Sequence, residues 1–328
     1  MVKGYLDGKT VLITGGTGTF GSAMVKHLLG HTKAAKVIVF SRDEYKQSQM
    51  AHLFKNQDRL NFFIGDIRDP ERLRRAFNRV DVVIHAAALK QVPALEYNPS
   101  EAIATNIIGT KNVIDAALDR DVDKVLVISS DKAVSPINLY GATKLCAERL
   151  SVAANAYRGK HGKTKISVIR YGNVIGSRGS IVELVESRKH TGVIPLTDKR
   201  MTRFWIHIEE IMKIVTNVLQ VMEGGEIFIP KMESLLVEDV LMELAPDCKL
   251  EIIGIRPGEK LHEVLMTEHE AERAHDIGDV FAVLPDFKSW NSKDSFKKKK
   301  KFDASSLYVS NNPKYLRTRK DVKKMLKV

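Results

Sequence analysis

The sequence predicts an α/β fold in which a doubly wound parallel sheet is followed by a smaller C-terminal lobe. Three observations support this prediction. Short segments rich in Val and Ile alternate with helix-length segments in the first half of the chain. A glycine-rich turn follows the first of these segments, and Gly- and Pro-spaced short segments take over after Tyr171. Alternating strands and helices are typical of a parallel sheet that is covered by helices on both faces.

Six apolar segments bounded by turn residues are the predicted strands, at 10–14, 36–40, 61–64, 80–86, 124–129 and 165–170. They show little polar alternation, as expected for strands that are buried on both faces. We therefore expect a sheet of the Rossmann type.

Helices are predicted between these strands at 21–29, 43–55, 70–77, 99–120 and 139–157. Asp43 is a suitable N-cap, and Pro70 and Pro99 suit a first helical turn. Beyond Tyr171 we expect a helix at 208–222, a strand at 226–230 and a short basic helix at 314–328. The predicted domains are a sheet domain (1–171 plus about 201–230), a lobe (about 172–200 plus 231–288) and a basic linker and tail (289–328).

Composition limits the class of protein. The chain has 328 residues, of which 44% are apolar, and this is enough for a large domain with a filled core. No apolar stretch approaches the roughly 18 residues of a membrane span, and the N-terminus lacks the layout of a signal peptide, so we expect a cytoplasmic protein. Cys146 and Cys248 show neither disulfide nor metal-ligand spacing. We expect buried, reduced thiols and no metal site.

The formal net charge of +12 is concentrated at the C-terminal end. From residue 288 onward there are 14 Lys and Arg against 3 Asp and Glu, a net charge of +11, which leaves +1 for the rest of the chain. A nearly neutral body gives no groove that would follow a phosphate backbone, so no nucleic-acid partner is expected. The lysine run at 297–301 is interpreted as a solvated loop, with an acidic partner as the alternative.

The turn after the first strand has the features of a dinucleotide-binding fingerprint. Gly15 suits a tight turn, Gly18 allows the backbone to approach a pyrophosphate, and Gly21 allows close packing of helix and strand. The helix N-terminus then faces the phosphates. The predicted cofactor contacts of this turn are Thr14, Gly15, Thr17, Gly18, Thr19, Phe20 and Gly21.

The end of the second strand favours NADP over NAD. Ser41, Arg42 and Lys46 offer a hydroxyl, a guanidinium and an ammonium group to a 2′-phosphate, where an NAD-binding chain would place an acid. Asp43 is the alternative contact to the ribose. Asp66 and Ile67, which end the third strand, are expected to meet the adenine.

A second group of residues has the types and spacing of an acid–base site. Ser130 ends a strand, and Tyr140 and Lys144 lie at i and i+4 on one face of the following helix. A tyrosine with an ordinary pKa near 10 is a poor base at neutral pH, but a nearby ammonium group and a cationic cofactor favour tyrosinate. Ser130 would then hold an alcohol that is being oxidised.

These segments resemble the extended short-chain dehydrogenases/reductases that modify nucleotide sugars. The motifs are TGGTGTFG, the strand end Ala86, Ala87 and Ala88, the pair Tyr140 and Lys144, and RYGNVIGSRGS. More narrowly, SSDKAVSPINLYGATKL, RMTRFWI and GIRPGEKLHE resemble the configuration-inverting UDP-N-acetylglucosamine 4,6-dehydratases. The resemblance covers residues from about 5 to 285. It implies NADP contacts at Ala86, Ala87, Ala88, Tyr140 and Lys144, with a UDP-sugar bound by the lobe.

The resemblance also implies a reaction. The C4 position of the sugar is oxidised by NADP, the C5 proton becomes acidic, the C6 hydroxyl leaves, and hydride returns to C6. Asp131 and Lys132 stand where retaining dehydratases carry an Asp-Glu pair, so Lys132 is the implied C5 base and Asp131 assists loss of the hydroxyl, directly or through water. The alternative role for Lys132 is structural, as an ion pair with Asp131.

The implied substrate contacts are Lys90, Asn173, Arg203, Arg256 and Glu259. His85, His207, Phe204 and Trp205 are interpreted as packing residues. The resemblance further implies a homo-oligomer, a dimer or a hexamer. Two alternatives remain open at this point: a nucleotide-sugar 4-epimerase of the same fold, and a cofactor-sensing regulatory protein.

Overall fold

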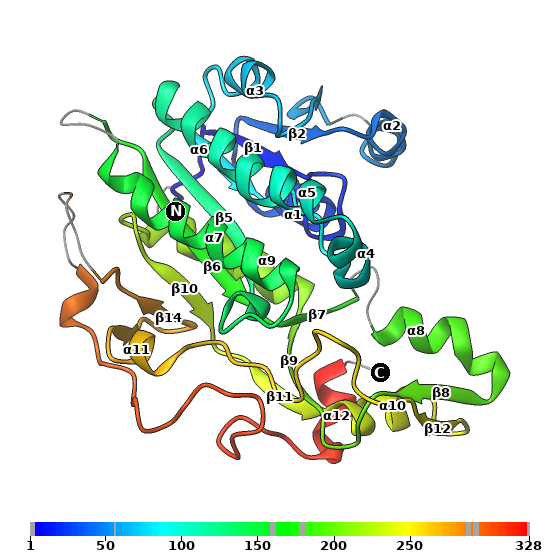
Figure 1. The fold of residues 1–328 in the computed structure, drawn as a ribbon. Coiled ribbons are helices and arrows are strands. Elements are labelled where there is room, and N and C mark those ends of the chain that lie inside the picture. The colour runs from blue at the N-terminus through cyan, green and yellow to red at the C-terminus, as the bar shows by residue number, and fades with distance from the viewer. Residues whose placement is uncertain are drawn as a thin grey trace.

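The computed structural model describes residues 4–55, 57–157, 162–176, 181–286, 290 and 295–326. One large sheet runs through the molecule, and a smaller lobe of short strands and helices packs at one end of it (Figure 1). This arrangement confirms the predicted fold class.

The large sheet contains nine strands in the order β13-β14-β10-β6-β5-β4-β1-β2-β3. Neighbouring strands from β3 to β10 pair in parallel, whereas β14 and β13 run antiparallel at the far edge. The bounds are β1 Thr10–Thr14, β2 Lys36–Ser41, β3 Leu60–Ile64, β4 Val82–His85, β5 Lys124–Ser130, β6 Lys165–Tyr171, β10 Ile227–Pro230, β13 Ala274–Asp276 and β14 Val280–Val283. The chain order reverses beside β1, which has β2 on one side and β4 on the other. This is the switch point where doubly wound folds bind ligands.

Helices cover both faces of the sheet. Helix α1 packs with α9 on one face, and α3, α6 and α7 pack in succession on the other (Figure 1). Their bounds are α1 Thr19–His31, α2 Glu44–Leu53, α3 Pro70–Ala76, α4 Val92–Tyr97, α5 Pro99–Ala102, α6 Gly109–Asp119, α7 Leu139–Ala153 and α9 Ile208–Val221. Asp43 caps α2 by accepting from Lys46 N, and prolines stand in the first turns of α3 and α5, as predicted.

The predicted helix at 99–120 is interrupted. A π-helical segment, Ile103–Ile108, joins α5 to α6. It turns the Asn106 side chain into the protein, where that residue is 1% exposed. Such segments recur at functional sites because the wider turn redirects one side chain.

The lobe consists of two small sheets. Strands β11, β9 and β7 form one of them, and β12 pairs with β8 in the other. The bounds are β7 Asn173–Ile175, α8 Ile181–Arg188, β8 Val193–Leu196, β9 Thr202–His207, β11 Glu233–Leu236, α10 Val237–Leu244, β12 Lys249–Ile252 and α11 Glu268–Ala271. A separate apolar cluster, which includes Val185, Ile194 and Leu241, packs α8 and α10 on the β8–β12 ribbon.

The C-terminal segment folds back over the molecule. The sequence predicts a basic linker and tail at 289–328, but Phe296 and Phe302 are buried. Tyr308 is also buried, and α12, Arg319–Leu326, packs beside α10. The predicted basic helix therefore begins five residues later than expected, and residues 287–289, 291–294 and 327–328 lie outside the described part of the chain. Aromatic side chains between the lysines explain the docking, because they bury apolar area that a purely charged segment would lack.

The prediction of two buried thiols is wrong. Cys146 is exposed and Cys248 is partly buried. Helix α7 presents Thr143, Lys144 and Ala147 to the interior, so helical periodicity turns Cys146 to solvent.

Within the described ranges, no helix is both long enough and apolar enough to cross a membrane. The same residues contain no group of three or more His, Cys, Asp or Glu side chains that could hold a metal ion.

Candidate active site

A cavity of about 490 Å³ opens at the carboxyl ends of β1, β4, β5 and β6. It brings together predicted residues from five separate segments: Gly15, Gly18, Thr19, Phe20, Gly21, Ala86, Ala88, Lys90, Ser130, Lys132, Tyr140, Lys144 and Asn173. Residues 177–180 of the motif RYGNVIGSRGS lie outside the described residues.

The glycine-rich turn has the geometry of a phosphate cradle. Gly15 has a φ of +67°, and a Cβ there would lie 2.8 Å from the Ala87 backbone, so only glycine lets the turn lie against the end of β4. Gly18 is the N-cap of α1. No side chain of the described residues caps this helix end, and no acid occupies its first turn. The helix N-terminus can therefore receive an anionic pyrophosphate.

Beneath this turn lies a neutral histidine. The Thr110 hydroxyl donates to Asn106 O (2.7 Å), so it must accept from His85 Nε2 (2.9 Å). His85 Nδ1 then accepts from the Thr14 hydroxyl (2.6 Å). Burial lowers the pKa of His85 to about 3. His85 and Thr14 thus fix the base of the cradle, in agreement with the packing role predicted for the histidine.

The ribose end of the site carries its own counter-charges. Arg42 Nη1 lies 3.5 Å from Asp66 Oδ2, and Lys46 Nζ lies 2.6 Å from Asp43 Oδ2. Hydrogen bonds from Arg68 lower the pKa of Asp66, against the effect of partial burial. A 2′-phosphate would have to compete with these carboxylates for the two predicted cations. Ile67 is buried and packs beside Gly109.

Tyr140 and Lys144 project from the first turns of α7 into the cavity. Burial raises the pKa of Tyr140, against the charge of Lys132 and a hydrogen bond with Ser130. Burial also lowers the pKa of Lys144 to about 8, and its Nζ donates to Ile128 O (2.5 Å). Ser130, Tyr140 and Lys144, which the sequence predicts to act together, therefore line the same cavity.

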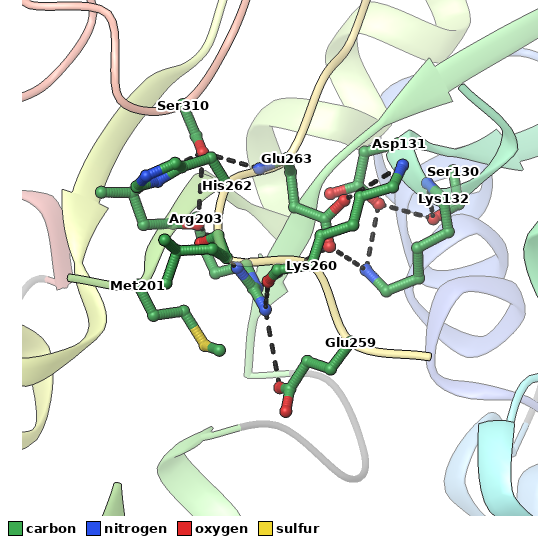
Figure 2. Close-up of polar contacts among 12 residues, drawn as sticks. Ser130, Asp131, Lys132, Met201, Arg203, Glu259, Lys260, His262, Glu263 and Ser310 are labelled. Atoms are coloured by element: carbon green, nitrogen blue, oxygen red, sulfur yellow. Dashed lines mark hydrogen bonds and ion pairs between the residues drawn. The ribbon is translucent and has the colours of Figure 1, made fainter. Parts of the chain in front are cut away.

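Asp131 and Lys132 form a 3₁₀ turn directly after β5. Asp131 is fully buried, and its Oδ1 accepts from Ser130 Oγ (2.8 Å) and Lys132 Nζ (3.1 Å) (Figure 2). Its Oδ2 is buried without a hydrogen-bond partner among the described residues. Lys132 lines the cavity and Asp131 lies behind it.

Of the predicted substrate contacts in the lobe, Asn173 lines the cavity, whereas Arg203, Arg256 and Glu259 are not among its lining residues. Asn173 begins β7 at the cavity, and Arg256 is exposed on the loop after β12. Arg203, on β9, is 6% exposed and donates to three backbone carbonyls, of Thr202, Lys260 and Leu261. Glu259 Oε1 lies 3.5 Å from Arg203 Nη2. Arg203 therefore holds the loop 258–263 in place, a role that the sequence did not predict.

A larger cavity, of about 820 Å³, lies between the C-terminal segment and the lobe sheet. It is lined by Lys301, Tyr308, Arg317 and other residues of that segment, and it contains none of the predicted site residues. The smaller cavity is therefore the candidate active site.

A family model described as polysaccharide biosynthesis protein matches residues 11–285 of this sequence. The chain belongs to this family. The UDP-N-acetylglucosamine 4,6-dehydratase (inverting) of Campylobacter jejuni subsp. jejuni is 46% identical over 318 residues, which cover 94% of this chain and 95% of that protein. The UDP-glucose 4-epimerase of Rickettsia conorii is 39% identical over 327 residues, which cover 97% and 95%. The X-ray structure of Pen from Bacillus thuringiensis has a TM-score of 0.89 and 36% identity, with 98% of both chains covered.

These similarities confirm the resemblance to the configuration-inverting dehydratases that the motifs indicated. The roles of single residues in this polysaccharide biosynthesis protein stay predictions.

Two residues of this family member were missed by the sequence analysis. The Asn106 side chain accepts from Leu89 N and donates to Leu89 O and to the Thr143 hydroxyl. It therefore joins the segment after β4 to α7. Glu263 lies 3.6 Å from Lys132 Nζ. The motif GIRPGEKLHE contains Glu263, but nothing in its spacing distinguishes this acid from Glu259.

Proposed function

We propose that this enzyme dehydrates UDP-N-acetylglucosamine at C4 and C6 and inverts C5, with NADP as its recycled cofactor. The observation that carries the proposal is Lys132 beside Ser130 and Tyr140 at one cavity, with Asp131 bonded to it from behind. An epimerase needs only an acid-base group at C4, whereas a second pair of charged groups suits chemistry at C5 and C6. The relative from Campylobacter jejuni supports the choice.

The cradle residues fit a nicotinamide dinucleotide. The turn from Gly15 to Gly18 and the N-terminus of α1 would lie against its pyrophosphate, whereas Gly21 packs on the turn itself. Ser41, Arg42 and Lys46 would face the 2′-phosphate of NADP. When bound, the cofactor would accept hydride from C4 and return it at C6.

The remaining steps belong to side chains. Tyr140 is proposed to take the proton of the C4 hydroxyl while Ser130 holds its oxygen. Lys132 would then remove the C5 proton, because the C4 ketone delocalises the resulting charge as an enolate. The enolate would expel the C6 hydroxyl, which takes up a proton and leaves as water. After C6 has been reduced, a proton would add to C5 on the opposite face. Asp131 does not line the cavity, so it would act on the C6 hydroxyl through Lys132 or a water molecule.

Lys132 needs a proton acceptor before it can act as a base. Burial would lower its pKa, but the charges of Asp131 and Glu263 outweigh burial and raise it. The neutral amine is therefore the minor form at rest.

The decisive experiment incubates the purified protein with UDP-N-acetylglucosamine in deuterated water without added nicotinamide cofactor. We expect loss of water, deuterium at C5 and the inverted configuration, read by mass spectrometry and NMR. The nucleotide released from the denatured protein is expected to have the mass of NADP. Tyr140→Phe is the control, and its rate is expected to fall by about 10²–10⁴-fold because it removes the acid-base group.

A product epimerised only at C4, with no deuterium at C5 and no loss of water, would replace this proposal by the 4-epimerase. The Rickettsia conorii relative makes that the second candidate. Retention of configuration at C5 would exclude Lys132 as the base that inverts this carbon, and release of NAD would overturn the cofactor assignment. A cytoplasmic location and a homo-oligomer stay predictions.

A further inference from the structure

Glu263 is a buried carboxylate in contact with three cations from three different segments. It is 2% exposed, and its oxygens lie 3.6 Å from Lys132 Nζ, 3.8 Å from Arg203 Nε and 3.9 Å from Lys260 Nζ. Figure 2 shows the Glu263 and Asp131 carboxylates on the same lysine ammonium.

The loop that carries Glu263 is fixed by groups other than its carboxylate. Asn138 Nδ2 donates to Gly258 O (2.7 Å), at the start of the loop. Glu263 N donates to Ser310 Oγ (2.8 Å), and Ser310 N donates to Glu263 O (2.9 Å). Arg170 Nη1 donates to Leu265 O (2.9 Å), just beyond the loop. The carboxylate can therefore be changed to an amide with the backbone still held.

We propose that Glu263 is a positioning residue for the reaction, which holds the Lys132 ammonium group at the cavity and sets its charge. The inference rests on the proposed function, because it assigns a role to the partner of the proposed C5 base.

The charged groups around Lys132 are balanced. Asp131, Glu259 and Glu263 supply three carboxylates, and Lys132, Arg203 and Lys260 supply three cations. Among the described residues, Tyr140 is a further titratable group that interacts with Lys132. Without the charge of Glu263, Arg203 and Lys260 would repel a lysine that keeps only Asp131 as its direct counter-ion.

This change has a definite sign. Glu263 raises the pKa of Lys132, whereas burial and Arg203 lower it. Glu263→Gln is therefore expected to lower that pKa by about 1–3 units, the usual effect of one close charge. Each unit increases the neutral amine about tenfold wherever Lys132 is mostly protonated.

The first measurement needs no turnover. Purified full-length protein is acetylated briefly at pH 8, and the rate at Lys132 is read by mass spectrometry relative to the unfolded chain. Lys132 is 29% exposed, so a small reagent can reach it. We expect the rate to rise at least tenfold in Glu263→Gln. Glu259→Gln, the matched control, removes a carboxylate of the same loop that contacts Arg203, and it is expected to change the rate less than threefold.

The second measurement is deuterium exchange at C5 as a function of pH. The limb of the profile that belongs to Lys132 is expected to move to lower pH by the same 1–3 units in Glu263→Gln. Glu263→Asp keeps the charge but retracts it, so its labelling rate should lie between wild type and Gln, at least threefold above wild type.

An unchanged labelling rate in folded Glu263→Gln would overturn the inference, whatever the wild type does with the sugar. If Gln fails to fold by circular dichroism, Glu263→Asp decides, and an unchanged rate there overturns the inference as well. Conversely, wild type that leaves UDP-N-acetylglucosamine intact, together with faster labelling in Gln, would reject the proposed function and retain the electrostatic role of Glu263.

Discussion

His85 shows how one buried side chain supports the glycine-rich turn from below. Its two ring nitrogens are satisfied by Thr14 and Thr110, in a tautomer that the Thr110–Asn106 hydrogen bond dictates. A protonated ring would have two donors and no acceptor for the Thr14 hydroxyl. The folded state therefore requires the neutral ring.

This requirement predicts a dependence of stability on pH. The pKa of His85 is lowered to about 3 in the folded chain, so between 6.5 and 3 the unfolded chain binds a proton that the folded chain does not. The free energy of unfolding should fall by about 1.4 kcal/mol for each pH unit below 6.5 through this residue. Urea unfolding at pH 7 and pH 5 measures it, with His85→Gln as the reference. A wild-type loss no larger than that of the variant would contradict the prediction.

At the scale of elements, the turn that carries Lys132 and helix α7 are packed unusually closely. The carbonyl of Lys132 lies against Gly141, where a Cβ would be 2.2 Å from that oxygen and 3.0 Å from the Pro136 side chain. This contact sets the distance between the turn that carries Lys132 and the helix that carries Tyr140.

Gly141→Ala is therefore expected to push the turn away from the helix while the fold survives. A displacement near 1 Å at a reacting group costs about 10²-fold in rate. We expect at least that loss of dehydration, with far-ultraviolet circular dichroism unchanged. The matched control is Gly30→Ala in α1, where the added methyl group meets open space and should stabilise the helix by about 0.5–1 kcal/mol. Full activity in Gly141→Ala would show that the close packing is dispensable.

Sequence periodicity was sufficient for the parallel strands and for their helices, because each of those patterns is local. The spacing of Tyr140 and Lys144 predicted one helix face, but their choice as site residues also needed the glycine-rich turn and Ser130. It could not find Glu263 or the role of Arg203, because both depend on contacts between segments about 60 to 130 residues apart. The π-helical segment was missed for a similar reason, since Asn106 gains its partners, Leu89 and Thr143, only in the folded protein.

At the scale of the whole molecule, the C-terminal segment contributes to the packing of the lobe. Val322 and Leu326 of α12 are buried in one cluster with Trp205, which is 4% exposed and also lines the candidate active site. His207 bonds Met325 O from the end of the same strand. The helix therefore packs on the same face of β9 from which Trp205 reaches the cavity.

A chain that ends at Thr318 should lose this cover. Removing Val322 and Leu326 from the cluster is expected to lower the free energy of unfolding by roughly 3–6 kcal/mol. Exposure of Trp205 should shift the tryptophan fluorescence to longer wavelength, whereas Trp290 bonds Gly224 O away from α12. Lys320→Ala, an exposed site of the same helix, is the control and should change neither quantity. Unshifted fluorescence in the shortened chain would contradict the packing of α12 on Trp205.

The bond between Ser310 and Glu263 also has a consequence for synthesis on the ribosome. Strands β1 to β10 are complete once residue 230 has emerged, but the loop around Glu263 gains its Ser310 partner only some 80 residues later. At about 5–20 residues per second this interval is roughly 4–16 s. During that time Lys132 already has Asp131 as a counter-ion, but the segment that carries Glu263 lacks its bonds to Ser310. The backbone bonds that fix Glu263 therefore form well after the strands of the large sheet have been made.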